Sequence, residues 1–434
     1  MRNNMVTLRR PLAIILTLAA LITSSCKDSA EDKIGHDELS QQETDASIAI
    51  AFGNETTGTL TEIPPEINEF FKKLGQASRS EKKTKPNEFF SADAMLSAVL
   101  STGSSDSLSA REKKQFKKNF RTTIKTYADP WVKQVAYDDY KITLIEKIND
   151  DQNIVYLKQY DNEYQIVHLF RWWIVKTEKG WRIYDYEDLS IGLRTISLMG
   201  QAYKNEFSSN KKPWVQDLAT LNNLLRATDL TDREQYLALE APLEKLKSTP
   251  LPLNIKSYAS MLTQTILTLK EDHEGALAEI LAAEEGNYGY PLFHYLHGAS
   301  LLALGRNQEA LESFQKFTEK FGNDSDTLEL VSDAHYGLGE FKKARQAALA
   351  GLTDNPNSAN CLACLSVTMT AEEITTPEAI ERFTKMKNSE SAFEISLDYL
   401  IAEEKEDIAL NLFKVFKKEH PESELKEYYK DLLE

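Results

Sequence analysis

Three alanines recur at a fixed interval in the second half of this chain of 434 residues. Ala276, Ala310 and Ala344 lie 34 residues apart, inside segments whose apolar residues follow a helical period. An interval of this size is typical of stacked helical units, because a single helix pair cannot bury its own apolar face. We therefore expect a helical solenoid that offers a surface to partners rather than a catalytic centre.

The residues around these alanines resemble the tetratricopeptide repeat. In the clearest unit, residues 290–324, the match rests on Gly298, Leu301, Gly305, Ala310, Phe314 and Phe317. The resemblance implies that Gly298 lets the first helix approach its neighbour and that Gly305 closes the turn. It also implies that Ala310 sits where the two helices come closest.

Neighbouring units keep part of this pattern. The unit from residue 325 carries Gly339, Ala344 and a terminal Pro356, with Ser332 where the first glycine is expected. In the unit before residue 290, Glu271 replaces the turn glycine. The spacing drifts further downstream, so the last units are expected to be irregular.

In this family the inner face of the first helix of each unit forms a groove for an extended peptide or a partner helix. Carried onto this chain, the groove residues are Leu292, Tyr295, Ala299 and Leu302 in one unit and Asp326, Glu329, Asp333 and Tyr336 in the next. A partner with an apolar anchor beside Lys or Arg would fit an apolar stretch next to an acidic one. Two other interpretations stay open. The acidic residues only keep the solenoid soluble, or the groove is filled by the chain's own terminal helix or by a second copy.

The amino terminus has the pattern of an export signal. Arg2, Arg9 and Arg10 precede an apolar run at 11–22, and small residues then lead to Cys26. A basic start, a short apolar stretch and a small-residue site are typical of a secretory signal. A membrane-spanning helix needs about 20 apolar residues, so this run is too short to span.

The same segment resembles a bacterial lipoprotein signal. The two serines before Cys26 match that motif, while Thr23 departs from the leucine that the family prefers. The resemblance implies removal of 1–25, acylation of Cys26, and a polar tether at 26–61. The protein would then be held on the periplasmic side or at the surface of a bacterial membrane. The formal net charge of −16 disfavours nucleic acid as a partner.

Residues 62–205 are predicted to form helices first and strands afterwards, which is typical of an α+β domain. Strands are expected at 140–148, 153–160, 163–176 and 180–187. The order resembles the nuclear-transport-factor-like or cystatin-like cone, in which a curved sheet wraps a long helix. The expected fold is therefore an α+β cone-like domain followed by an all-α tetratricopeptide-type superhelix at 212–434.

Strand alternation predicts that His168 shares a face with Phe170 and Trp172, and that Asp185 lies in phase with Trp181. A His/Asp pair inside an aromatic-lined cone can transfer protons, although a core histidine is the commoner interpretation. The chain has no nucleophile elbow, no phosphate loop and no metal spacing among its histidines. We expect no enzyme, no metal and no cofactor.

Cys361 and Cys364 are the only cysteines besides Cys26. In an oxidising compartment such a pair suggests a disulfide. Residues three apart on a helix have α-carbons about 5 Å apart, within disulfide range. Buried thiols are the competing interpretation. A metal site would need two more ligands nearby, and no His or Cys is adjacent.

These patterns together predict a non-catalytic envelope lipoprotein that collects protein partners on a helical-repeat groove. The competing class is a carrier of a small ligand or lipid that uses the cone, with the repeats as an accessory.

Overall fold

The computed structural model describes residues 56–433 with gaps, most of them within 102–138, 162–165, 190–211, 228–232 and 287–291. The expected signal at 1–25, its Cys26 and most of the tether at 26–61 lie outside the described residues. Among the described residues, no helix combines the length and apolar character that crossing a bilayer requires.

An antiparallel sheet of six strands dominates the first half of the described chain. Its strands lie in sequence order, so each one pairs with its neighbours along the chain. They are β1 (Gly58–Thr59), β2 (Asp139–Asn149), β3 (Gln152–Asp161), β4 (Ile166–Thr177), β5 (Gly180–Asp188) and β6 (Leu193–Arg194). The expected antiparallel α+β region is confirmed, whereas closure of the sheet into a cone stays a prediction.

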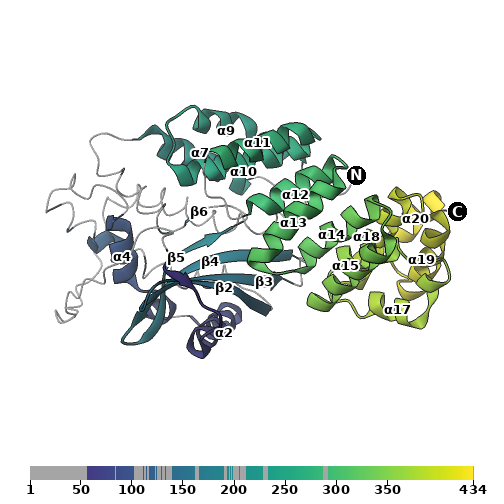
Figure 1. Ribbon diagram of the computed structural model, residues 1–434, viewed down its shortest axis with the longest axis horizontal. Helices are drawn as coiled ribbons and strands as arrows, with labels where there is room; N and C mark the ends of the chain where they lie inside the picture. Colours follow the sequence, from purple (N-terminus) through teal and green to yellow (C-terminus); the bar gives the residue numbers. More distant parts are fainter. Residues whose placement is uncertain are drawn as a thin grey trace.

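Helices cover both faces of this sheet. Helices α2 (Pro65–Arg79), α3 (Pro86–Phe89) and α4 (Ala92–Ser101) precede it, and on one face the Phe71 ring of α2 lies 6.0 Å from the Trp172 ring of β4. On the other face Tyr156 of β3 lies 5.6 Å from Phe321, in the helical half of the chain. In Figure 1 the helices α7 to α11 lie above the sheet and α2 lies below it.

Every regular element described from residue 213 onward is a helix. The elements are α7 (Pro213–Ala227), α8 (Arg233–Leu237), α9 (Glu240–Lys247), α10 (Leu253–Leu269), α11 (His273–Glu285), α12 (Phe293–Ala303), α13 (Asn307–Phe321), α14 (Ser325–Gly337), α15 (Phe341–Asp354), α16 (Ala359–Ser366), the 3₁₀ turn η3 (Glu373–Thr375), α17 (Pro377–Thr384), α18 (Ser389–Ala402), α19 (Glu406–Glu419) and α20 (Leu425–Leu433). The helices that follow the first three hairpin turns begin at His273, Asn307 and Phe341. These starts keep the 34-residue interval.

A left-handed residue closes each of the regular hairpin turns. Glu271, Gly305 and Gly339 have φ values of 63°, 71° and 73°, and Glu404 between α18 and α19 has 56°. The next residue donates its backbone N–H to a carbonyl five positions back, as Arg306 does to Leu301 at 2.9 Å. This is the Schellman closure of a helix, which favours glycine at the left-handed position.

Small residues at the helix crossings explain the alanine interval. Ala276, Ala310 and Ala344 are at most 1% exposed. A β-carbon on Gly298 would lie 2.6 Å from the Phe314 ring, so only glycine fits there. The equivalent Ser332 is accommodated because its hydroxyl donates to the carbonyl of Ala344 at 2.9 Å.

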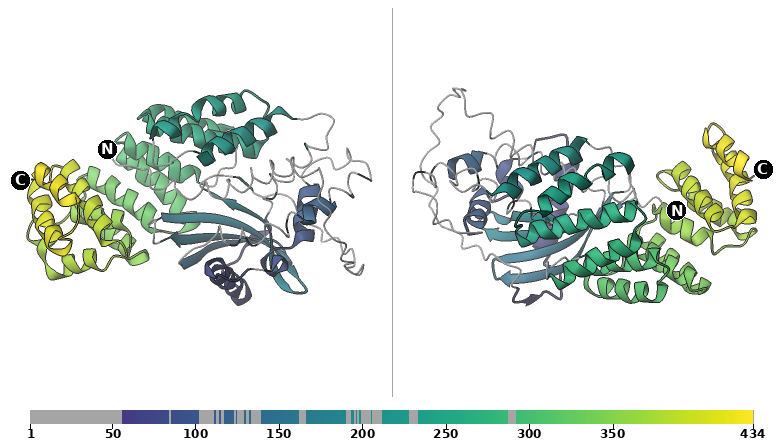
Figure 2. Two further views of the ribbon diagram at one scale, coloured as in Figure 1. Left: turned by 180° about the vertical axis from the view of Figure 1, so that it is seen from behind. Right: turned by 90° about the horizontal axis from the view of Figure 1, so that it is seen from above.

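The downstream units are irregular, as their drifting spacing predicts. Helix α16 is only eight residues long and is separated from α17 by the η3 turn. Pro356, expected at the end of a unit, is exposed in the link between α15 and α16. The helices α17 to α20 lie beyond the end of the sheet in both views of Figure 2.

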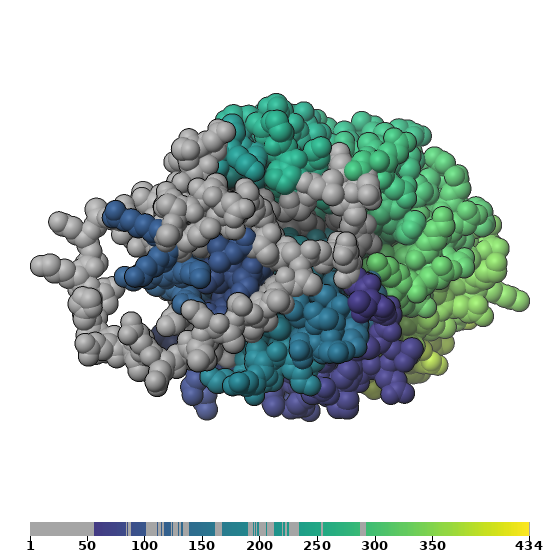
Figure 3. Space-filling view, turned by 60° about the vertical axis from the view of Figure 1, so that its left-hand side comes forward, coloured from purple at the N-terminus to yellow at the C-terminus, as the bar shows by residue number. Residues whose placement is uncertain are grey.

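One apolar core runs from the sheet into the helical half. It contains Trp172 and Trp173 of β4, Leu218 of α7, Tyr258 of α10 and Phe317 of α13, all of them buried. A second core holds α16 to α20 together. In the space-filling view, green residues of the helical half lie directly beside purple residues of the N-terminal half (Figure 3). The regions expected at 62–205 and 212–434 therefore share a core.

The left-handed φ of Glu271 gives a stability prediction. Glu271→Gly should raise the free energy of unfolding by about 1 kcal/mol, because a residue with a β-carbon is disfavoured in this region. Urea denaturation followed by circular dichroism measures the change. Gly305→Ala is the matched control. It should lower the free energy of unfolding by a similar amount, because it places a β-carbon on a left-handed residue. No clash adds to this effect, since no heavy atom lies within 4 Å of the added β-carbon. A loss of stability in Glu271→Gly would contradict this account.

Candidate interaction surface

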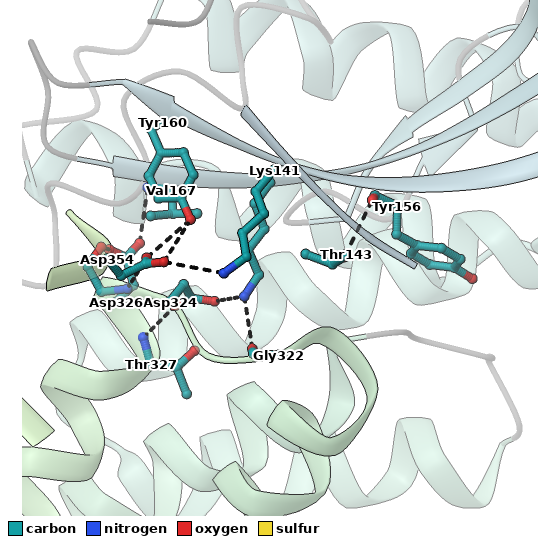
Figure 4. A network of polar contacts seen from close by, with 12 residues as sticks. Lys141, Thr143, Tyr156, Tyr160, Val167, Gly322, Asp324, Asp326, Thr327 and Asp354 are labelled. Carbon is teal, nitrogen blue, oxygen red and sulfur yellow. Dashed lines mark hydrogen bonds and ion pairs between the residues drawn. The ribbon is translucent and has the colours of Figure 1, made fainter. Parts of the chain in front are cut away.

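A buried ion pair joins the sheet to the repeats (Figure 4). Lys158 of β3 places its Nζ 2.6 Å from Oδ2 of Asp324, and the two side chains are 1% and 6% exposed. The same ammonium group donates to the carbonyl of Gly322 at 2.9 Å. Asp324 also caps α14, because its Oδ1 accepts the N–H of Thr327 at 2.7 Å. Both charges thus have further hydrogen-bond partners, which a buried pair requires.

A second carboxylate extends this joint. Asp354, at the end of α15, accepts the hydroxyl of Tyr160 at 3.1 Å and the backbone N–H of Ser325 at 3.1 Å. The Nζ of Lys141, on β2, lies 3.5 Å from Oδ1 of Asp354. Burial raises the pKa of Tyr160 above its usual value, and Asp354 adds to that effect. The hydroxyl therefore stays protonated and keeps donating at physiological pH.

The predicted groove meets the chain's own sheet at its first acidic residue. Asp326 accepts the backbone N–H of Val167, on β4, at 3.1 Å. Burial raises the pKa of Asp326 well above its usual value, and the nearby Asp324 and Glu329 raise it further. The carboxylate of Asp326 is thus already engaged by the sheet, and its expected role in binding a basic partner stays a prediction.

Apolar groove residues at the start of α12 are also engaged. Leu292 belongs to the core shared with the sheet. The ring of Tyr295 lies 5.4 Å from Phe317 and 6.3 Å from Phe314. Both residues thus pack within the chain, Leu292 in the core shared with the sheet and Tyr295 against α13.

Farther along the repeats, α14 is in direct contact with α18. Asp333 of α14 accepts the hydroxyl of Tyr399, on α18, at 2.5 Å. Helix α16 lies between these two helices, and its residues Ala359 to Ser366 are at most 1% exposed apart from Asn360. A helix buried on nearly all sides offers a peptide no surface of its own. Of the eight expected groove residues, Leu292 is buried, and the other seven keep partial exposure, Asp326 and Asp333 among them.

The hairpin tips present an apolar strip, of which only Leu302 and Tyr336 were expected to lie on a binding surface, as groove residues. Leu338 and Phe341 are 40% and 53% exposed, and the Phe341 ring lies 5.3 Å from Tyr336. Leu302 and Leu304 occupy the positions equivalent to Tyr336 and Leu338 in the preceding hairpin, and both are partly exposed. We call these five residues the tip strip. The 34-residue register, applied to positions just before each turn, would have found it.

Neighbouring tips touch each other. A β-carbon on Gly337 would collide with the Asn307 side chain, so the turns of the α12/α13 and α14/α15 hairpins are packed together. The strip lies at the opposite end of α14 from Asp324 and the sheet, because α14 runs from Ser325 at the joint to Gly337 at the tip. It is thus separate from the part of α14 that contacts the sheet.

The expected disulfide between Cys361 and Cys364 is not formed, and both cysteines are buried thiols. The Sγ of Cys361 donates to the carbonyl of Ser325 at 3.2 Å, and that of Cys364 to Oδ1 of Asp333 at 3.3 Å. On a regular helix the β-carbons of such residues lie about 5–6 Å apart, whereas a disulfide needs about 3.5–4.5 Å. The α-carbon distance alone was a misleading guide.

The expected pairing of His168 with Asp185 is wrong. The β4/β5 register skips Tyr184, so that Ile174 faces Ile183 but Trp173 faces Asp185. Such a bulge reverses the alternation, and Asp185 falls on the opposite face from His168. Its carboxylate instead accepts the N–H of Ile196 at 2.9 Å and the Nε of Arg194 at 3.1 Å. Asp185 thereby fixes the segment after β5.

Within the described ranges, no group of three His, Cys, Asp or Glu side chains is arranged to hold a metal ion. The predicted absence of a metal or cofactor stays a prediction for the chain as a whole.

Neither a protein-family model nor a curated protein sequence matches this chain. Among solved structures it is similar to YrrB, described as a tetratricopeptide protein with an unusual peptide-binding site, at 18% identity and a TM-score of 0.28, over 40% of this chain and 92% of that one. It is also similar to the C-terminal part of a tetratricopeptide repeat-containing protein from Cytophaga hutchinsonii, at 15% identity and a TM-score of 0.33, over 52% and 90%.

The buried ion pair gives the second prediction. Lys158→Met should lower the free energy of unfolding by about 3 kcal/mol, because it leaves Asp324 buried without its counter-charge. Adding Asp324→Asn should recover part of the loss, because it removes the uncompensated buried charge. Asparagine also keeps the helix cap. Lys141→Met is the matched control, and its half-exposed pair should cost less than about 1 kcal/mol. Equal losses in the two lysine variants would show that burial of the pair is not decisive.

Proposed function

We propose that this protein is a non-catalytic envelope lipoprotein that collects protein partners on its helical repeats. The observation that carries the proposal is the tip strip. Leu338 and Phe341 form an exposed apolar pair, and equivalent apolar residues stand at the neighbouring hairpin tip. Adjacent exposed apolar side chains on a folded surface are typical of a protein-binding site.

The partner that this strip fits differs from the one expected for the groove. The groove was expected to take a segment with Lys or Arg, but Asp326 and Asp333 make contacts inside the chain. Leu338 and Phe341 are exposed at the tip, and the exposed Lys342 and Lys343 follow Phe341 directly, with the Nζ of Lys343 2.8 Å from the carboxylate of Glu340. An apolar segment flanked by acidic residues is the complementary partner.

Two substitutions at the tip should abolish capture of such a partner. Leu338→Asp combined with Phe341→Asp should lower recovery of co-purifying polypeptides at least tenfold, because central apolar anchors carry most of the binding energy of an interface. Quantitative mass spectrometry of the crosslinked, membrane-released protein measures the recovery. Leu281→Asp on α11 is the matched control, since that leucine is 39% exposed, close to the 40% of Leu338. Unchanged recovery in the tip variant would refute the site, and a bound lipid or small molecule without polypeptides would favour the carrier function instead.

The membrane anchor rests on the signal-like segment that ends at Cys26. Each buried methylene of an acyl chain contributes about 0.8 kcal/mol to membrane binding, so two or more chains hold a soluble body firmly. Cys26→Ser should therefore remove the acyl mass and move the protein from the membrane fraction to the soluble fraction. Retention of the variant at the membrane would mean that another segment anchors it.

A further inference from the structure

Two thiols fasten α16 to α14. Cys361 and Cys364 are 0% and 1% exposed, and each Sγ donates to an oxygen atom of α14. Their acceptors are the carbonyl of Ser325, at the start of that helix, and the carboxylate of Asp333, four residues before its end. The pair therefore fastens α16 at two separate points of its neighbour.

Each residue that accepts a thiol hydrogen bond also takes part in a hydrogen bond that leads to another part of the molecule. The N–H of Ser325 donates to Asp354, which accepts the hydroxyl of Tyr160 on the sheet. Asp333 also accepts the hydroxyl of Tyr399 on α18. The thiols thus stand between the sheet joint on one side and the last helices on the other.

Cys361 is tightly packed against α15. A β-carbon on Gly351 of α15 would collide with the Cys361 Sγ, so the sulfur atom occupies space that only a glycine leaves open. Burial raises the pKa of the Cys361 thiol well above its usual value, and nearby carboxylates, Glu329 first among them, act in the same direction. In the closed structure the thiol stays protonated and keeps its donor hydrogen.

We propose that Cys361 and Cys364 form a redox-sensitive latch, in which a reversible intrahelical disulfide releases α16 from α14. A disulfide has no S–H group, so its formation removes both donors at once. It also requires the two β-carbons to approach by about 1 Å or more from their helical separation, which distorts the first turns of α16. Strained disulfides of this kind are the readily reduced ones.

The reaction proceeds by thiol–disulfide exchange with a small disulfide. The thiolate of one cysteine attacks a sulfur atom of the small disulfide, which forms a mixed disulfide and expels one small thiol. The second cysteine then attacks the protein sulfur of that mixed disulfide and expels the second small thiol. Two S–H bonds of the protein are lost, one S–S bond is formed, and the small disulfide is reduced to two thiols. Because both cysteines are buried, exchange takes place through transient opening of α16.

The latch is tested with the full chain carrying Cys26→Ser, so that only this pair can react. The folded protein is equilibrated with glutathione at graded ratios of disulfide to thiol. Intact mass spectrometry then follows the loss of two hydrogens, and hydrogen exchange follows α14, α16 and residues 322–327. We expect oxidation without denaturant, at least tenfold faster amide exchange in these segments on oxidation, and full recovery on reduction.

The double variant Cys361→Ser/Cys364→Ser is the matched control, because serine keeps a donor but forms no disulfide. Its exchange should resemble that of the reduced protein at every glutathione ratio. The proposal is overturned if the pair stays reduced even in fully oxidised glutathione, in which an unfolded peptide with the sequence of residues 358–366 forms its disulfide. It is also overturned if oxidation leaves exchange unchanged or slows it, since the disulfide would then be a structural one. Neither readout uses partner capture, so the outcome is independent of the tip strip.

Discussion

The ammonium group of Lys158, buried against Asp324, governs how the two halves of the chain are arranged. Removing two charges from water is costly, so the pair is tolerated only because its remaining hydrogen-bonding groups are also satisfied. The Gly322 carbonyl and the Thr327 N–H meet that requirement, and both belong to the turn into α14. The ion pair therefore couples the conformation of this turn to the position of β3. A shift of the sheet along the repeats would leave a charge buried without its partner, which disfavours other arrangements strongly.

Much of the helical half follows from local chemistry and was predictable. The interval of Ala276, Ala310 and Ala344 corresponds to real helix crossings, and the turn position that Glu271 shares with Gly305 has the same left-handed backbone. Both features depend on residues that are close in sequence, where steric rules act directly. The antiparallel order of the strands was predictable for the same reason, because short polar turns connect them.

The differences between the expected groove and the structure share one physical cause, which is contact between residues far apart in sequence. Asp326 was assigned to an open groove, but the N–H of Val167 that binds it lies 159 positions earlier. Asp333 meets Tyr399, 66 positions later. The pattern of α14 alone cannot show which of its faces the sheet and α18 will cover. The β-bulge at Tyr184 is a different case, because it reverses the strand alternation without any compositional signal, and Asp185 changes face as a result.

The hairpin of α14 and α15 connects the three features described above. One end carries Asp324 and Asp354, which hold the sheet, and the other end carries Leu338 and Phe341. Between them, α14 supplies the acceptors for Cys361 and Cys364. The neighbouring tips pack through Gly337 and Asn307, so the tip of this hairpin is also held in place by the hairpin before it. A single helix, α14, thus supplies contacts to the sheet at its start, to the two thiols along its length and to the preceding hairpin at its end.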